Sequence, residues 1–142
     1  MLFFKKRKDG GQQSPVDAYF LFEIKGLCSI ALLKFNKGSR ENFHSHAFNA
    51  FTWFLFGDMM EERFIGKSGK QPIIENTRYK FGLKPKFTSK ENLHRVVAYK
   101  TSWCLTIRGR WEKTWMEYNQ ETDTIQVLEH GRNVIETKKF MG

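Results

Sequence analysis

The stretch from Gly38 to Gly57 reads GSRENFHSHAFNAFTWFLFG, with two histidines one residue apart between two glycines. Side chains alternate between the two faces of an extended strand, so His44 and His46 are expected side by side on one face. His94 follows about fifty residues later, at the start of another apolar segment. If His94 projects from an adjacent strand, three neutral imidazoles meet as a first-row transition metal requires. The spacing also fits unrelated surface or packing histidines.

From Tyr19 onward the chain consists of short apolar segments separated by glycine-containing turns, including Lys25-Gly26 and Gly57-Asp58. Several segments alternate apolar and polar residues, as strands with one buried and one wet face do. No useful helical period interrupts them, so the sequence predicts an all-β protein, either a closed barrel or a two-sheet jelly roll. The expected strands are 19–24, 27–35, 51–56, 61–65, 73–81, 93–99, 103–108, 114–118, 124–128 and 134–140.

The chain of 142 residues has a common size for one domain. Residues 1–15 join a basic cluster, Lys5 to Lys8, to a run of Gly and Gln with little to bury, which predicts a mobile basic leader before a barrel domain at 16–142. The three apolar residues 2–4 leave another interpretation open. They could form an extra edge strand, within the chain or across a dimer.

The sequence resembles the cupins, small β-barrel proteins whose first motif places a glycine before a His-x-His pair and a second glycine about ten residues after it. Gly38, His44, His46 and Gly57 match the first motif, and Gly82, Pro85 and His94 are candidates for the second. The resemblance covers roughly residues 19 to 118 and is closest to small, largely uncharacterised bacterial and phage cupins. It implies a single-domain cupin barrel, a double-stranded β-helix of the jelly-roll type.

Two departures from the cupin pattern narrow the implied chemistry. Many cupins carry a glutamate ligand four or five residues after the second histidine, where this chain has Ala50 and Phe51, and the second motif is stretched before its histidine. What remains resembles the all-histidine triad of the thiol dioxygenase cupins. The resemblance therefore implies one divalent transition metal on His44, His46 and His94, with Fe(II) expected first and Zn, Mn, Ni or Cu as alternatives.

Two classes of function stay open. The first is a metal-dependent dioxygenase-like oxidoreductase or isomerase acting on a small anionic molecule, with Arg108 and Arg110 as substrate-binding residues that share one face at a strand end. The second is a non-catalytic cupin that binds a small ligand, a nucleotide or nucleic acid, or a partner protein. Crowding of the histidines by Phe48, Phe51 and Phe54 would favour this second class.

The basic residues concentrate between Lys67 and Arg95, where eight lysines and arginines accompany two glutamates. An electrostatic surface of this kind predicts at most weak nucleic-acid binding that is indifferent to sequence and sensitive to salt. Whole-chain charge agrees, since 24 Lys and Arg against 15 Asp and Glu give a net charge of +9.

Cysteine usage and the opening residues bear on the compartment. Cys28 and Cys104 each lie in an apolar segment, and no export signal is visible, so we expect two reduced, buried thiols in the cytoplasm. No stretch approaches the roughly 18 apolar residues of a membrane span, so no membrane partner is expected. Because cupins commonly pair through strand edges, a homodimer is expected.

Overall fold

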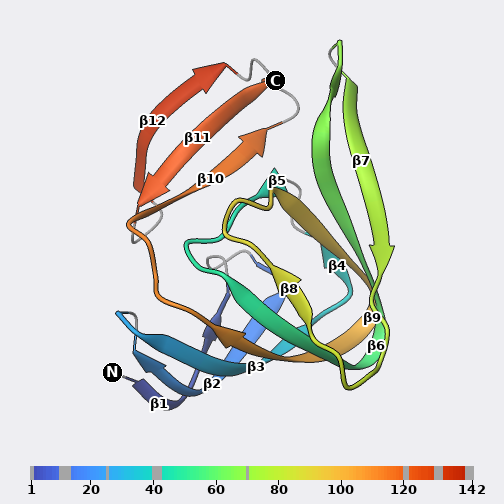
Figure 1. Ribbon diagram of the computed structural model, residues 1–142, viewed down its shortest axis with the longest axis vertical. Helices are drawn as coiled ribbons and strands as arrows, with labels where there is room; N and C mark the ends of the chain where they lie inside the picture. The colour runs from blue at the N-terminus through green and yellow to red at the C-terminus, as the bar shows by residue number, and fades with distance from the viewer. Residues whose placement is uncertain are drawn as a thin grey trace.

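The computed structural model describes residues 2–9, 14–24, 26–39, 43–69, 71–119, 122–129 and 133–139. All helical or strand elements in these residues are strands, which confirms the all-β prediction (Figure 1). They are β1 (Leu2–Lys8), β2 (Val16–Ile24), β3 (Cys28–Phe35), β4 (Gly38–Ser39), β5 (Phe43–His44), β6 (Ala50–Ser68), β7 (Gln71–Arg78), β8 (Lys86–Thr88), β9 (His94–Arg108), β10 (Thr114–Asn119), β11 (Thr124–Glu129) and β12 (Asn133–Lys139).

Two long strands, β6 and β9, pair antiparallel and connect the two halves of the fold (Figure 1). The start of β6 pairs with the end of β9, whose other edge carries β3 and then β2 and β1. Farther along, β6 pairs with the start of β9, which there adjoins β4 and β5, and β5 leads on to β10, β11 and β12. Each long strand therefore belongs to both halves of a single-domain jelly-roll barrel.

The turn predicted at Gly57-Asp58 is wrong, because β6 continues through it as one strand. The pairing of β6 with β9 shifts register on both sides of this position, so the strand is bulged and bends there without ending. Gly57 has a φ of 120°, and a Cβ on it would lie 2.1 Å from Ser102 Oγ. Glycine is thus required for a close approach of two strands, where the sequence pattern had indicated a turn.

The N-terminal residues differ from the separate leader expected before residue 16. β1 pairs antiparallel with β2 from Leu2 to Lys8, so it is an edge strand of the same sheet, as the alternative interpretation of residues 2–4 allowed. Arg7 and Lys8 form ion pairs with Glu23 and Asp17 of β2. These carboxylates explain how so basic a segment joins the sheet. The importance of residues 1–15 to stability stays a prediction.

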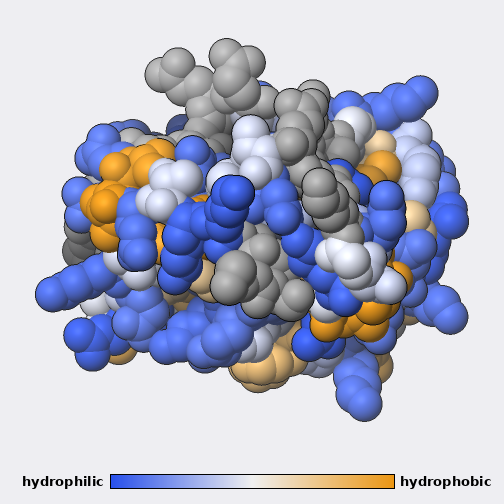
Figure 2. All heavy atoms as spheres, turned by 90° about the horizontal axis from the view of Figure 1, so that it is seen from above, coloured by the Kyte–Doolittle hydropathy of each residue, from blue (hydrophilic) through white to orange (hydrophobic). Residues whose placement is uncertain are grey.

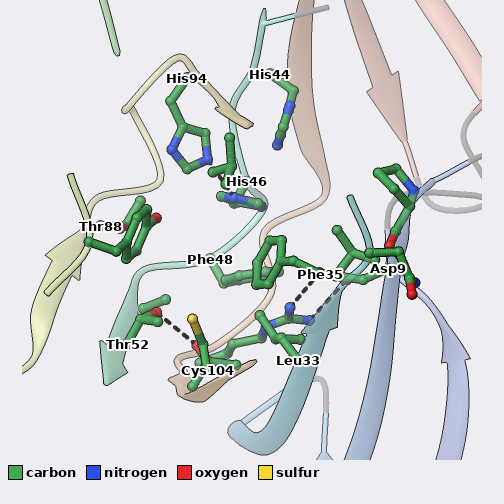
Figure 3. A pocket seen from close by; sticks show the side chains of 18 of the residues that line it. Asp9, Leu33, Phe35, His44, His46, Phe48, Thr52, Thr88, His94 and Cys104 are labelled. Carbon is green, nitrogen blue, oxygen red and sulfur yellow. Dashed lines mark hydrogen bonds and ion pairs between the residues drawn. The ribbon is translucent and has the colours of Figure 1, made fainter. Parts of the chain in front are cut away.

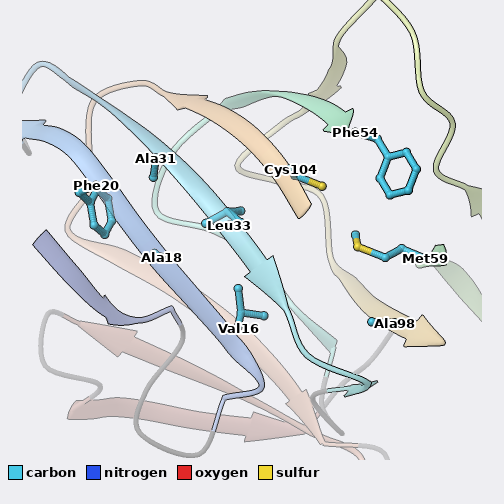
Figure 4. Packing of buried hydrophobic residues seen from close by; sticks show 9 residues of the cluster. All are labelled: Val16, Ala18, Phe20, Ala31, Leu33, Phe54, Met59, Ala98 and Cys104. Atoms are coloured by element: carbon cyan, nitrogen blue, oxygen red, sulfur yellow. The ribbon is translucent and has the colours of Figure 1, made fainter. Parts of the chain in front are cut away.

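The main core lies where β2, β3, β6 and β9 face the interior (Figure 4). Its buried members are small and medium side chains with one large ring from each of β2 and β6: Val16, Ala18, Phe20, Ala31, Leu33, Phe54, Met59, Ala98 and Cys104. Both cysteines are free, as predicted, but only Cys104 is buried, because Cys28 lies half-exposed at the start of β3.

The outer surface is mostly hydrophilic, with separate hydrophobic patches, in the view of Figure 2. Among the large apolar side chains left exposed, Phe87, Phe51 and Ile107 are register partners across β8, β6 and β9. Within the described part of the chain, no helix is long and apolar enough to cross a membrane.

Candidate functional site

The three histidines meet at one end of the barrel, as the sequence predicted. His44 ends β5 and is the register partner of His94, the first residue of β9, while His46 lies just beyond β5. Their three rings lie 5.0 to 5.1 Å apart, centroid to centroid, and one ligand nitrogen from each falls within 4.8 Å of the others (Figure 3). The fourth histidine, His130, lies outside the described residues.

The histidine cluster fits a metal ion of the first transition series. His46 Nε2 lies 2.9 Å from His94 Nε2. Two imidazole nitrogens that each lie about 2.1 Å from one ion, with a right angle between the two metal–nitrogen bonds, are about 3.0 Å apart. His44 and His94 are buried and His46 half-buried, so the ring donors lie in a sheltered position. Neutral imidazoles suit Zn, Cu, Fe and Ni, four of the five metals expected from the sequence, whereas Mn is better suited by oxygen ligands.

Glu61 holds the far side of His94, a role that the sequence analysis missed. Its Oε2 lies 2.6 Å from His94 Nδ1, and Lys86 Nζ donates to its Oε1 at 2.9 Å. Burial raises the pKa of Glu61, but the hydrogen bond and charge of His94, helped by Lys86, outweigh burial and set it at about 2. A carboxylate accepting from Nδ1 fixes the ring and leaves Nε2 toward the other histidines, as in many metal sites.

The three histidines line one pocket together with Phe48, Arg108 and a set of mostly apolar side chains, the kind of lining that small-molecule sites have. Phe48 stacks on His46 with ring centroids 5.0 Å apart, whereas Phe51 faces outward and Phe54 belongs to the main core. Of the three phenylalanines that were expected to crowd the histidines, Phe48 alone packs against one of them. Apart from the histidines, Asp9, Asn36 and Arg108, the lining is mostly apolar with a few hydroxyls and one thiol, and it includes Val16, Leu33, Phe35, Ala50, Thr52, Tyr79, Thr88, Val96, Cys104 and Thr106.

The two arginines proposed as substrate ligands are separated by the structure. Arg108 ends β9, is buried, lines the pocket and is paired with Asp9. Arg110 lies past the end of the strand and is exposed, and it is not among the lining residues. The expected shared face is wrong because β9 stops between them, so strand alternation no longer applies at Arg110.

Most of the basic segment from Lys67 to Arg95 is paired with carboxylates. Its ion pairs are Lys67–Asp123, Arg78–Asp58, Lys86–Glu61, Lys90–Glu112 and Arg95–Glu62. The partners lie on several strands and are scattered through the sequence, so the net charge of the segment overstates the positive potential that it presents.

Comparison with solved structures gives the fold. A sugar phosphate isomerase of the cupin superfamily from Silicibacter pomeroyi matches with a TM-score of 0.53 and 12% identity, over 98% of this chain and 90% of that one. The chain has the cupin fold. No family model matches the sequence, and no curated protein matches it either.

Two further solved structures share the cupin barrel. The iron(II) form of HppE with substrate matches with a TM-score of 0.56 and 11% identity, over 76% of this chain and 60% of that one. An oxalate decarboxylase from Lactobacillus farciminis, in complex with formate, matches with a TM-score of 0.53 and 14% identity, over 75% of this chain and 31% of that one. This chain thus spans a third to three fifths of those two proteins, and the likeness is one of fold.

Proposed function

We propose that the protein is a mononuclear metal cupin that binds one divalent transition metal on His44, His46 and His94 and acts on a small anionic molecule in the adjoining pocket. The observation that carries the proposal is the convergence of three ring nitrogens within 4.8 Å at the head of that pocket. Iron(II) is the first candidate, since three neutral imidazoles suit it and a structural neighbour is an iron(II) protein.

A metal bound by three histidines supplies a Lewis acid with open positions for ligands. The chain's own residues bind and orient the substrate around it. Glu61 accepts a hydrogen bond from His94 and keeps that ring fixed, while Phe48 covers one face of His46 and excludes water from it. Oxidation and isomerisation are both compatible with this arrangement.

An anionic substrate is favoured by the charge at the other end of the pocket. Arg108 is the cation among the lining residues, and its side chain is 2% exposed. A guanidinium keeps its charge at every accessible pH, so it favours a carboxylate or phosphate within reach. Two neighbours of the same fold are named for anionic small molecules, a sugar phosphate in one case and oxalate in the other.

Elemental analysis of protein made without a histidine tag tests the metal assignment. We expect about one transition-metal ion per wild-type chain and close to none in a His44→Ala, His46→Ala double variant. His130 precedes Gly131 in an expected turn and is not part of the three-histidine motif, so a His130→Ala variant is the matched control and should keep its metal. Equal metal content in the wild type and the double variant would overturn the proposal.

A further inference from the structure

Arg108 carries a buried charge in the pocket lining, at the end of β9 opposite to His94, the first residue of that strand. Its guanidinium carbon lies 4.7 Å from the centre of the Phe48 ring and 5.7 Å from that of Phe20. Aromatic faces attract a cation but do not neutralise it. A buried guanidinium therefore needs an anion that also accepts its hydrogen bonds.

Asp9, which lies 99 positions earlier in the chain, supplies that anion. Arg108 donates from Nη2 to Asp9 Oδ2 at 2.7 Å and from Nη1 to Asp9 Oδ1 at 3.2 Å. The third donor, Arg108 Nε, is buried and has no hydrogen-bond partner in the described part of the chain. Asp9 thus satisfies the two Nη nitrogens of the guanidinium, and the buried Nε donor is left over.

The two partners differ in how readily each can leave the pair. The Asp9 side chain is 24% exposed, whereas that of Arg108 is 2% exposed. The backbone of Asp9 is held separately, because its amide donates to the Val16 carbonyl at 2.8 Å. The Asp9 carboxylate is therefore the more exposed partner of the pair, and the backbone hydrogen bond that holds its segment does not involve the carboxylate.

We infer that Arg108 is the carboxylate subsite of the pocket and that Asp9 occupies it as an internal substitute, which an entering carboxylate ligand displaces. The inference deepens the proposed function and rests on it for the role of the histidine end. Exchanging one carboxylate for another keeps the buried charge balanced, and a ligand that also reaches Nε gains a hydrogen bond that Asp9 does not make.

The lining between the two ends restricts the body of this ligand. It combines apolar walls from Val16, Leu33 and Phe48 with the hydroxyls of Thr52 and Thr106, which lie 3.3 Å apart. The ligand class is therefore a small carboxylate with a short apolar or hydroxylated body, whose far end faces the histidines. An internal competitor lowers the apparent affinity for such a ligand by the fraction of molecules in which Arg108 is free.

Binding of propionate to the metal-free, full-length chain tests the exchange, with propionamide as the neutral probe of the same shape. Calorimetry at fixed ionic strength should show that Asp9→Asn binds propionate at least about tenfold more tightly than the wild type does, because the competitor is gone. Asp17→Asn removes a carboxylate that is paired with Lys8 outside the pocket, and it should keep the wild-type affinity. Propionamide should bind to none of them.

Equal propionate affinity in the wild type and a folded Asp9→Asn variant would overturn the inference. If Asp9→Asn does not fold, nitrogen-15 NMR of the wild type decides: propionate should shift the Arg108 Nε–H resonance saturably, and an unmoved resonance would overturn it. Propionate binding is measured on the metal-free chain, whereas the metal assignment is tested by elemental analysis, so a failure of the metal assignment is distinguishable from a failure at Arg108.

Discussion

The two ends of the pocket hold their chemistry in different ways. At one end, three imidazole rings come together from a His-x-His pair and the first residue of β9. At the other end the last residue of that strand, Arg108, is a permanent cation. The histidine end could be predicted from a His-x-His pair and a third histidine about fifty residues later. The arginine end depends on Asp9, which lies 99 positions away along the chain. The strand β9 thus joins a histidine cluster that the sequence motif predicts to an arginine whose pairing with Asp9 only the tertiary fold creates.

The reactivity of the Cys104 thiol tests whether the histidine end and the Arg108 end of the pocket share one interior that excludes water. Cys104 lines the pocket, and burial raises its pKa to about 12. Its thiolate is therefore roughly three orders of magnitude scarcer near neutral pH than that of an ordinary thiol of pKa about 8.5. Iodoacetamide at about pH 8 should modify the half-exposed Cys28 and leave Cys104 intact, as peptide mass spectrometry would show.

The pH dependence of the modification tests the raised pKa of Cys104. Raising the pH to about 10 keeps Cys104 well below its pKa, so it should remain unmodified there, and both cysteines should react equally once the chain is unfolded in urea. If native Cys104 were modified at the rate of Cys28, water and reagent would have access to the pocket interior beside it. The histidine end and the Arg108 end of the pocket would then be separate sites.

Replacing Glu61 with glutamine weakens the histidine end alone. The variant keeps the shape of the side chain but removes the charge that His94 and Lys86 contact. We expect metal affinity to fall by about 10- to 100-fold, the usual cost of losing such a carboxylate. Competition with a fluorescent chelator measures it. Glu62→Gln, which breaks the neighbouring pair with Arg95, is the control and should keep its affinity.

Much of the fold could be predicted because strand alternation and glycine punctuation are local signals. The same signals misled at Gly57, where the glycine serves a bulge and a close contact with Ser102 and not a turn. They also failed at β1, whose residues Lys5 to Lys8 look like a solvated charge cluster. Only the acidic partners on β2 make that strand acceptable at the sheet edge, and those partners are distant in sequence.

The candidate site divides in the same way. His44, His46 and His94 could be found because metal ligands need a particular residue type at a particular spacing. Glu61 could not, since a glutamate in a strand looks like any solvent-facing residue until its burial against His94 is known. Asp9 is harder still, because its role depends on a charge contributed by another strand.

Removing residues 1–15 tests the arginine end and the role of β1 together. The deletion uncovers Arg108 and the buried Glu23, so we expect the melting temperature to fall by ten degrees or so, equivalent to more than roughly 2 kcal/mol. Removing residues 133–142 is the matched control. It takes away the edge strand β12, whose side chains are all exposed, and should cost much less.

An unchanged melting temperature after the first deletion would show that residues 1–15 are a dispensable leader. Sedimentation velocity on the same proteins tests the expected homodimer. A wild-type mass of two chains that drops to one after the deletion would place β1 at the dimer contact, and a mass of one chain throughout would contradict the dimer.

The smallest expected effect is on nucleic-acid binding, which depends on the charged exterior of the protein and not on the pocket. Five basic residues of the segment from Lys67 to Arg95 are paired with carboxylates, while Lys80 and Lys84 are exposed between β7 and β8. If about two lysines contact phosphates, the affinity for a labelled duplex should fall roughly tenfold between about 50 and 200 mM salt, whatever its sequence. Fluorescence anisotropy measures this, and a Lys80→Ala, Lys84→Ala variant should lose most of the binding. Tight binding that persists at high salt and prefers one sequence would instead require a nucleic-acid site built from groups other than these exposed charges.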